Sequence, residues 1–196
     1  MTDPELTGPE LTGLELTGLE LTDLARDIDA RCRLRGSFVL RSGEIADEYF
    51  DKYLFEADPG LLRRVAERMA ALLPPGTDAL GGLELGGVPI DTMLSQLTGL
   101  PALFVRKQAK DYGTRKLAEG GNPAGQHVVL VEDVITTGGA VLAAATALRE
   151  LGAQVSTVVC PIDRSAAGQS VLSAHSVSVR AVLTKADLDA VRPAAR

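Results

Sequence analysis

Cysteine, histidine and tryptophan are scarce or missing in this chain of 196 residues, which has two cysteines, two histidines and no tryptophan. So few cysteines, with no visible secretory leader, do not suit a disulfide-stabilised secreted protein and predict a cytoplasmic location. His127 and His175 have no cysteine or carboxylate partners at zinc spacing, so we expect neither residue to be a metal ligand or a catalytic base. Cys160 lies in an apolar run and is predicted to be a buried apolar residue.

Long apolar runs and an excess of positive charge are missing as well. Hydrophobic residues make up 45% of the chain, yet none of their runs approaches the roughly 18 residues that a membrane-spanning helix needs. The net charge of −6 argues against broad nucleic-acid binding, which depends on a cationic surface. We therefore expect no membrane and no nucleic-acid partner, and a small-molecule substrate is the better hypothesis.

The N-terminal residues form a tandem repeat of the units ELTGP, ELTGL, ELTGL and ELTDL. A five-residue period matches neither a helix nor a strand, and each glycine weakens a helix by roughly 1 kcal/mol. The repeat predicts a disordered tail over residues 1–18, with a partner-binding segment as the alternative. Order is expected from about Leu19, because Leu21, Leu24 and Ile28 follow helical spacing.

Apolar strand-like runs alternate with helical stretches along the rest of the chain. A strand SFVLRSG and an aromatic strand EYFDKYLFE precede a helix over residues 59–73, and RSAAGQSVLSA continues the alternation late in the chain. The later strands are predicted at DALGGLE, PALFVRK, HVVLVED, QVSTVVCPID and SVSVRAVL. This alternation predicts an α/β fold with a mostly parallel central sheet flanked by helices.

The stretch VVLVEDVITTGGA, residues 128–140, carries the most specific chemistry. Its glycines allow close approach of the backbone to a phosphate, while threonine hydroxyls and the amides that open the next helix can donate hydrogen bonds. Glu132 and Asp133 would repel a phosphate, but adjacent carboxylates can accept hydrogen bonds from the two hydroxyls of a ribose. The stretch therefore predicts a ribose 5-phosphate cradle. The alternative is an acidic helix cap with no ligand.

This motif resembles the 5-phosphoribosyl 1-diphosphate (PRPP) signature of the phosphoribosyltransferases. The earlier run RKQAKDY, residues 106–112, resembles the catalytic loop of the orotate phosphoribosyltransferases in particular. The resemblance covers roughly Leu24 to Ala190. It implies the type I phosphoribosyltransferase fold as a single domain over residues 19–196, with a small N-terminal hood at about 19–58 and a core at about 59–190.

The resemblance implies a role for each matched residue. Lys110 and Asp133 would be catalytic, with Lys110 nearest to the departing diphosphate, and Tyr112 stands where many members of the family have histidine. The PRPP-binding residues would be Arg106, Lys107, Lys110, Tyr112, Glu132, Asp133, Val134, Ile135, Thr136, Thr137, Gly138, Gly139 and Ala140. The orotate-binding residues would be Arg41, Tyr49, Phe50, Thr136 and Arg164, with the Arg164 guanidinium facing the orotate carboxylate. The turn ELGGVP departs from the family, because Leu85 and Gly86 replace a Tyr-Lys pair that some members use to hold diphosphate.

The activity implied is transfer of the phosphoribosyl group from PRPP to orotate, with Mg²⁺ as cofactor held mainly through PRPP oxygens and with no confident protein ligand to the metal. A homodimer is also implied, in which loop 107–120 reaches the neighbouring site. Two alternatives remain. One is a phosphoribosyltransferase for a purine or uracil, which would share the cradle without needing Arg164. The other is a non-catalytic regulator that senses PRPP.

Overall fold

The computed structural model describes residues 18–40, 42–108, 117–165 and 171–192. Its elements follow one another as α1 (Gly18–Cys32), β1 (Arg33–Val39), β2 (Ile45–Phe50), α2 (Tyr53–Glu56), α3 (Pro59–Ala70), β3 (Ala79–Leu83), α4 (Gly87–Thr98), β4 (Ala102–Val105), β5 (Ala118–Glu119), β6 (His127–Val131), β7 (Val134–Ile135), α5 (Gly139–Glu150), β8 (Gln154–Asp163), the 3₁₀ turn η1 (Ser173–His175), β9 (Ser178–Thr184) and α6 (Lys185–Ala190). Across these ranges, no helix is both long and apolar enough to cross a membrane.

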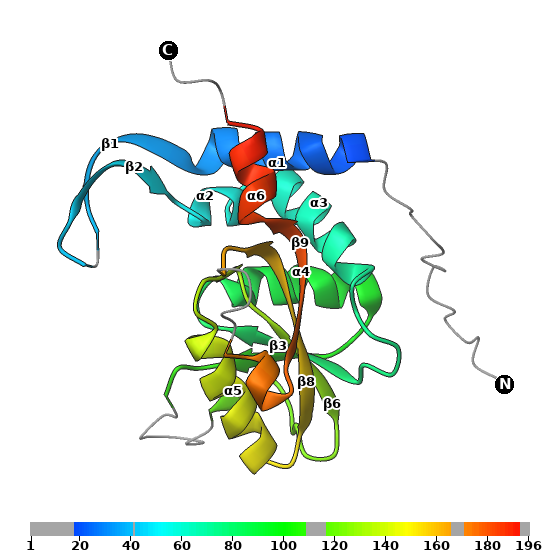
Figure 1. Cartoon of the computed structure of the whole chain (residues 1–196). Helices are drawn as coiled ribbons and strands as arrows, with labels where there is room; N and C mark the ends of the chain where they lie inside the picture. Colours follow the sequence, from blue (N-terminus) through cyan, green and yellow to red (C-terminus); the bar gives the residue numbers. More distant parts are fainter. Residues whose placement is uncertain (1–17, 41, 109–116, 166–170, 193–196) are drawn as a thin grey trace, which may run out of the picture.

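A seven-stranded sheet forms the centre of the molecule (Figure 1). Its strands run in the order β5-β4-β3-β6-β8, and both β7 and β9 also pair with β8. Every pair is parallel except β4 with β5. The prediction of an α/β fold with a mostly parallel sheet is confirmed. The carboxyl ends of β3, β4, β6 and β8 consequently meet at one edge, where such sheets bind ligands.

Side chains alternate between the two faces of the sheet and build one apolar layer on each. Leu80 and Val129 belong to the cluster that also holds residues of α1, α3 and α4. Leu130 and Cys160 belong to the opposite cluster, with residues of α5. Cys160 is fully buried, as predicted, and burial raises the pKa of its thiol. Because a slip of one residue would move every apolar side chain to the wrong face, this alternation fixes the register of the strands. The carboxyl edge of the sheet is therefore a rigid base for a site.

The N-terminal part differs from the prediction of a single strand over EYFDKYLFE. Strand β2 ends at Phe50, and α2 begins at Tyr53. The Asp51 side chain accepts a hydrogen bond from the Tyr53 amide at 3.2 Å, while the Asp51 amide donates to the Cys32 carbonyl at 2.8 Å. An aspartate that caps its own turn in this way ends a strand. Phe55 can then be fully buried in the core.

Two helical predictions also need correction. The helix over 59–73 ends at Ala70, and Leu72 and Leu73 follow it in a turn. The described part of RSAAGQSVLSA contains only the 3₁₀ turn η1 before β9 begins.

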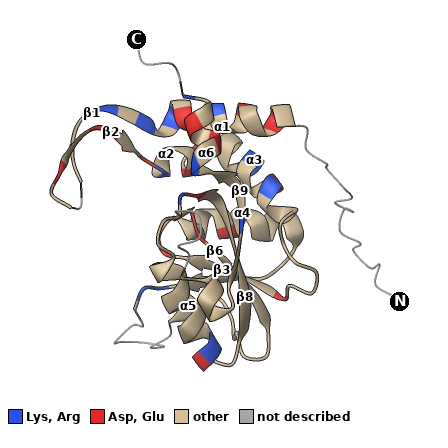
Figure 2. Cartoon of the chain, in the orientation of Figure 1, with Lys and Arg blue, Asp and Glu red and all other residues tan. Residues whose placement is uncertain are grey.

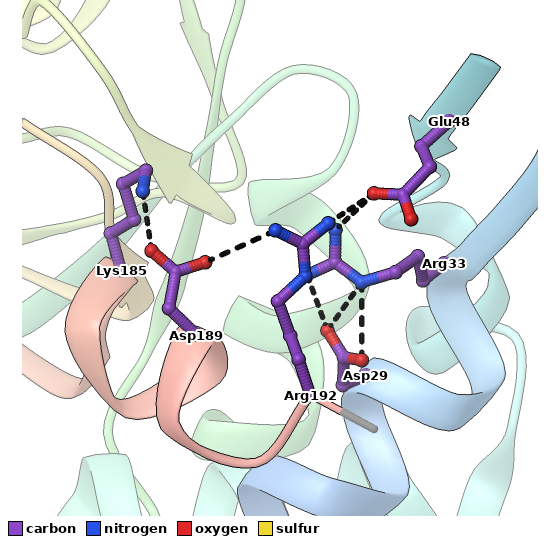
Figure 3. Close-up of polar contacts among 6 residues, drawn as sticks. All are labelled: Asp29, Arg33, Glu48, Lys185, Asp189 and Arg192. Carbon is purple, nitrogen blue, oxygen red and sulfur yellow. Dashed lines mark hydrogen bonds and ion pairs between the residues drawn. The ribbon is translucent and has the colours of Figure 1, made fainter. Parts of the chain in front are cut away.

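Strands β1 and β2 form an antiparallel hairpin that projects from the body of the molecule (Figure 1). Charged residues gather at the base of this hairpin and along α1 and α6, whereas the strands of the sheet are mostly uncharged (Figure 2). At the base, Arg33 pairs with Asp29 at 2.6 Å and with Glu48 at 3.2 Å. Arg192 also pairs with Glu48, which ties the hairpin to the end of α6 (Figure 3). The Arg33–Asp29 pair is shielded, with 17% and 6% of the side chains exposed, so salt screens it less than the exposed pairs.

Candidate active site

The stretch between β6 and α5 forms an open turn at the carboxyl edge of the sheet. Strand β7 pairs with the end of β8, and α5 begins at Gly139. Gly138 has a φ of 79°, and a Cβ there would lie 2.8 Å from the Leu172 side chain, so only glycine fits. Thr136 and Thr137 are exposed, and the first turn of α5 has neither an acidic residue nor a side-chain cap. The Gly139 amide donates weakly to Thr137 Oγ1 at 3.5 Å, and amides and hydroxyls arranged in this way suit an anion such as phosphate.

The two acids before this turn have different surroundings. Glu132 is half-buried and accepts a hydrogen bond from the Asp133 amide at 3.1 Å. Asp133 is only 1% exposed. One of its oxygens accepts a hydrogen bond from the Val134 amide at 2.5 Å, and the other forms an ion pair with the Lys52 ammonium. Asp133 is therefore held on both oxygens, whereas the Glu132 carboxylate is held by the Asp133 amide.

The turn between β3 and α4 closes over Asp133. A Cβ at Gly86 would lie 1.6 Å from Asp133 Oδ2 and 2.9 Å from Glu56 Oε1, so no side chain fits at this position. Burial, with the nearby Asp133 charge, raises the pKa of Glu56 to about 8. The same two causes raise the pKa of Glu132 to about 8. The carboxyl groups of Glu56, Glu132 and Asp133 thus lie near the single ammonium of Lys52. The net charge of this cluster therefore depends on how many of the carboxyl groups carry a proton, or on a bound ligand.

The pKa of the Lys52 ammonium is raised as well, which for an ammonium favours the charged form. Burial alone would lower the pKa of its ammonium, but the hydrogen bond and attraction from Asp133, together with Glu132, raise it. Lys52 therefore stays charged, and its positive charge compensates the buried acids.

Basic residues lie at the end of the neighbouring strand β4. The Lys107 amide donates to Glu84 Oε1 at 2.7 Å, which joins the turn after β3 to the turn after β4. Arg106 Nε is buried and has no hydrogen-bond partner within the described ranges. Both residues line a pocket of about 300 Å³ that extends to Ala140 in the first turn of α5. The cationic end of β4 thus borders a hollow that reaches Ala140, the last residue of the cradle.

The residues predicted to bind the base come together only in part. The Arg164 guanidinium carbon lies 5.7 Å from the centre of the Phe50 ring, and the Arg164 amide donates to the Ile135 carbonyl at 2.8 Å. Tyr49 instead lies against Phe38, with 5.6 Å between ring centres. Neighbouring residues of a strand point to opposite faces, so Phe50 faces Arg164 and Tyr49 does not. Arg41, Lys110 and Tyr112 lie outside the described residues.

Two residues of this cluster, Lys52 and Glu56, were not predicted from the sequence. The prediction of a strand over EYFDKYLFE gave these two residues no role in the site. In the observed turn of helix they are four residues apart, which places both on one face, toward Asp133. The pattern Lys-x-x-x-Glu was the available signal.

The phosphoribosyl transferase domain family matches residues 61–187 of the chain. An orotate phosphoribosyltransferase from Nocardioides sp. is 68% identical over 171 residues, which cover 87% of this chain and 96% of that protein. An orotate phosphoribosyltransferase from Methanocella arvoryzae is 40% identical over 158 residues, or 81% of this chain and 90% of that protein.

A solved structure gives the same result at the level of the fold. Orotate phosphoribosyltransferase from Mycobacterium tuberculosis in complex with PRPP superposes with a TM-score of 0.73 and 28% sequence identity. The match covers 87% of this chain and 99% of that one. The similarity therefore spans nearly the whole length of these relatives.

Proposed function

The chain belongs to the orotate phosphoribosyltransferases, and from this premise we propose that it transfers the phosphoribosyl group of PRPP to orotate, giving orotidine 5′-phosphate and diphosphate. One observation carries the proposal for the site. The Arg164 amide donates to the Ile135 carbonyl, so the backbone of this exposed residue lies beside the start of the turn that opens α5, while its guanidinium lies against the Phe50 ring. A group suited to a carboxylate and a turn suited to a phosphate are thus side by side.

The cradle would bind the donor. The Thr136–Ala140 turn would hold the 5′-phosphate through its amides and hydroxyls. Glu132 and Asp133 would accept hydrogen bonds from the ribose hydroxyls. Arg106 supports this assignment, because its buried Nε lacks a partner among the residues described and borders the same pocket. Arg106 and Lys107 would face the diphosphate.

The other side would bind the base. Arg164 can take the orotate carboxylate in a bidentate pair, and the neighbouring Phe50 ring offers a flat apolar contact to the pyrimidine. By the family resemblance, Arg41 would also bind orotate, and Lys110 would also bind the diphosphate end of PRPP.

The chemistry is a displacement at the anomeric carbon of the ribose. The bond from this carbon to the diphosphate oxygen breaks, the bond to orotate N1 forms, and N1 gives up its proton. Positive charge develops on the sugar ring as the diphosphate departs, as in glycosyl transfer generally. The carboxylates of Glu132 and Asp133 beside the ribose would stabilise this charge, and the cationic residues would stabilise the leaving group.

Mg²⁺ is part of the proposal as a cofactor. No cluster of three or more metal-ligating side chains occurs in the described ranges, and we propose that the metal is held mainly through PRPP oxygens. Mg²⁺ commonly retains water and binds substrate phosphates, which fits a donor that carries a diphosphate. When bound, it would neutralise charge on the diphosphate. We also propose a homodimer acting in the cytoplasm, which is consistent with two free, buried cysteines.

The test is an absorbance assay of orotate consumption with PRPP and Mg²⁺, run beside adenine, hypoxanthine and uracil. We expect orotate to be consumed and the other bases to react far more slowly. Consumption of another base with orotate untouched would overturn the proposed acceptor.

A further inference from the structure

Lys52 lies immediately before α2 and contacts the buried acid of the cradle. Its ammonium forms an ion pair with Asp133 Oδ2, although the Lys52 side chain is 34% exposed and that of Asp133 only 1%. The ammonium also lies 5.4 Å from the centre of the Tyr53 ring. Lys52 therefore enters the cradle from the hood, far along the chain from the motif that it contacts.

The position opposite Lys52 cannot supply this charge. Gly86 stands against the same oxygen, and a side chain there would collide with Asp133 at 1.6 Å. At this turn the chain has Leu85 and Gly86 in place of a Tyr-Lys pair, and the Leu85 side chain is exposed. The β3–α4 turn thus closes over Asp133 without bringing a cation, and the cation comes from the hood.

The other charged groups at this point are acidic. Glu56 contributes a buried oxygen, Oε1, that has no hydrogen-bond partner within the described ranges, and Glu132 lies next to Asp133 in sequence. A buried carboxylate that loses the ammonium paired with it is strongly destabilised and tends to move or to take up a proton. Asp133 would then no longer be a charged acceptor in a fixed orientation.

We propose that Lys52 is a positioning residue for PRPP binding: it holds the buried Asp133 carboxylate, with the Val134 amide fixing the second oxygen, and so fixes the start of the turn that receives the donor. This inference rests on the part of the proposed function that names PRPP as the phosphoribosyl donor, and it does not require orotate to be the acceptor. Lys52 acts through Asp133, so its effect falls on PRPP, while orotate, bound at Phe50 and Arg164, is spared.

The test compares Lys52→Met, which keeps the length of the side chain and removes its charge, with Lys52→Arg. The matched control is Lys185→Met, because Lys185 also pairs with an aspartate, Asp189, but is 59% exposed and lies on α6. Binding of PRPP with Mg²⁺ is measured by calorimetry, and KM is measured for each substrate. For Lys52→Met we expect the Kd and KM for PRPP to rise about tenfold or more, with the KM for orotate within about twofold of wild type. Lys52→Arg should restore most of the affinity, and Lys185→Met should leave both substrates unchanged.

A second variant separates positioning from folding. Lys52→Met with Glu56→Gln removes one ammonium and one neighbouring carboxyl together, so we expect it to fold more stably than Lys52→Met and still to bind PRPP weakly. Unchanged PRPP affinity in Lys52→Met, or an equal loss for PRPP and orotate, would overturn the inference. So would full recovery of PRPP binding in the double variant. If wild type binds PRPP in a Lys52-dependent way but consumes no orotate, the proposed acceptor is wrong and the role of Lys52 stands.

Discussion

The two halves of the site are built in different ways. The part of the donor half that would hold the ribose 5-phosphate is one continuous stretch, residues 132–140, fixed by the pairing of β7 with β8 and by Gly138, whose left-handed position only glycine fits. The acceptor half is assembled from Phe50 at the end of the hairpin and Arg164 after β8. A continuous half depends on local backbone geometry, whereas an assembled half depends on how the hood is anchored to the core.

This difference predicts that the two halves can be damaged separately. Changes within the cradle should weaken PRPP and leave orotate nearly unaffected. Changes at the base of the hairpin should do the reverse. Lys52 is the exception that joins them, since it belongs to the hood by sequence and to the donor half by contact.

The largest effect is expected from Asp133→Asn in the donor half. Replacing a buried, charged acceptor by a neutral amide should lower kcat/KM for PRPP about 100-fold, or about 3 kcal/mol. Steady-state kinetics with each substrate varied in turn measure the effect, and the KM for orotate should change little. If Asp133 is merely a helix cap, the variant would lose only about 1 kcal/mol of stability and use PRPP normally.

Gly138→Ala should have the next largest effect. It strains a left-handed residue and drives a methyl group toward Leu172, so we expect about a tenfold loss of PRPP affinity and a loss of roughly 1–2 kcal/mol in the free energy of unfolding.

Gly99→Ala is its control. Gly99 has a similar φ of 75° at the end of α4, with open space around the site of a Cβ. It should lose stability alone and keep normal PRPP affinity in calorimetric titration. Equal PRPP affinity in the two variants would show that the backbone of the cradle does not govern donor binding.

Glu56→Gln tests the carboxyl cluster through pH. Burial and Asp133 raise the pKa of Glu56 from 4.5 to about 8, so between these values the folded state holds a proton that the unfolded state has lost. The free energy of unfolding of the wild type therefore falls as pH rises through this window. Without this group the fall should be smaller by roughly 1–2 kcal/mol in denaturant titrations between about pH 5 and pH 8. Identical curves for the two proteins would contradict the assignment.

Glu48→Gln, in the acceptor half, should have the smallest effect. It weakens the contacts of Glu48 with Arg33 and Arg192 at the base of the hairpin. Because such partly exposed pairs contribute about 0.5–1 kcal/mol, we expect the KM for orotate to rise a few-fold and the KM for PRPP to stay constant.

Glu67→Gln is the control for the hairpin, since Glu67 pairs with Arg63 on the exposed face of α3. It should leave both KM values unchanged. A larger change for PRPP than for orotate in Glu48→Gln would mean that the hairpin does not anchor the acceptor half.

The fold and the donor half were within reach of the sequence, because both depend on short-range patterns. Apolar runs separated by helices specify a parallel sheet, and the stretch 128–140 carries its whole geometry within a strand, a turn and a helix. The turn at Asp51 was missed because one side-chain cap outweighed the strand preference of the aromatic residues around it.

The contacts between distant segments were not predictable in the same way. Lys52 meets Asp133 across 81 positions only once β2 ends and α2 turns inward, and no local pattern of residues encodes that distance. Likewise, Tyr49 and Phe50 are neighbours in sequence, and which of them faces Arg164 is set by the register of the hairpin.

The central claim is that this site recognises orotate through Arg164 beside a PRPP cradle. The most direct test is the ratio of kcat/KM for orotate to that for uracil, which lacks the carboxylate, in wild type and in Arg164→Ala. We expect wild type to prefer orotate by at least about 100-fold, and Arg164→Ala to lose most of that preference with its KM for PRPP unchanged. An unchanged preference in Arg164→Ala, or no consumption of orotate by wild type, would contradict the claim.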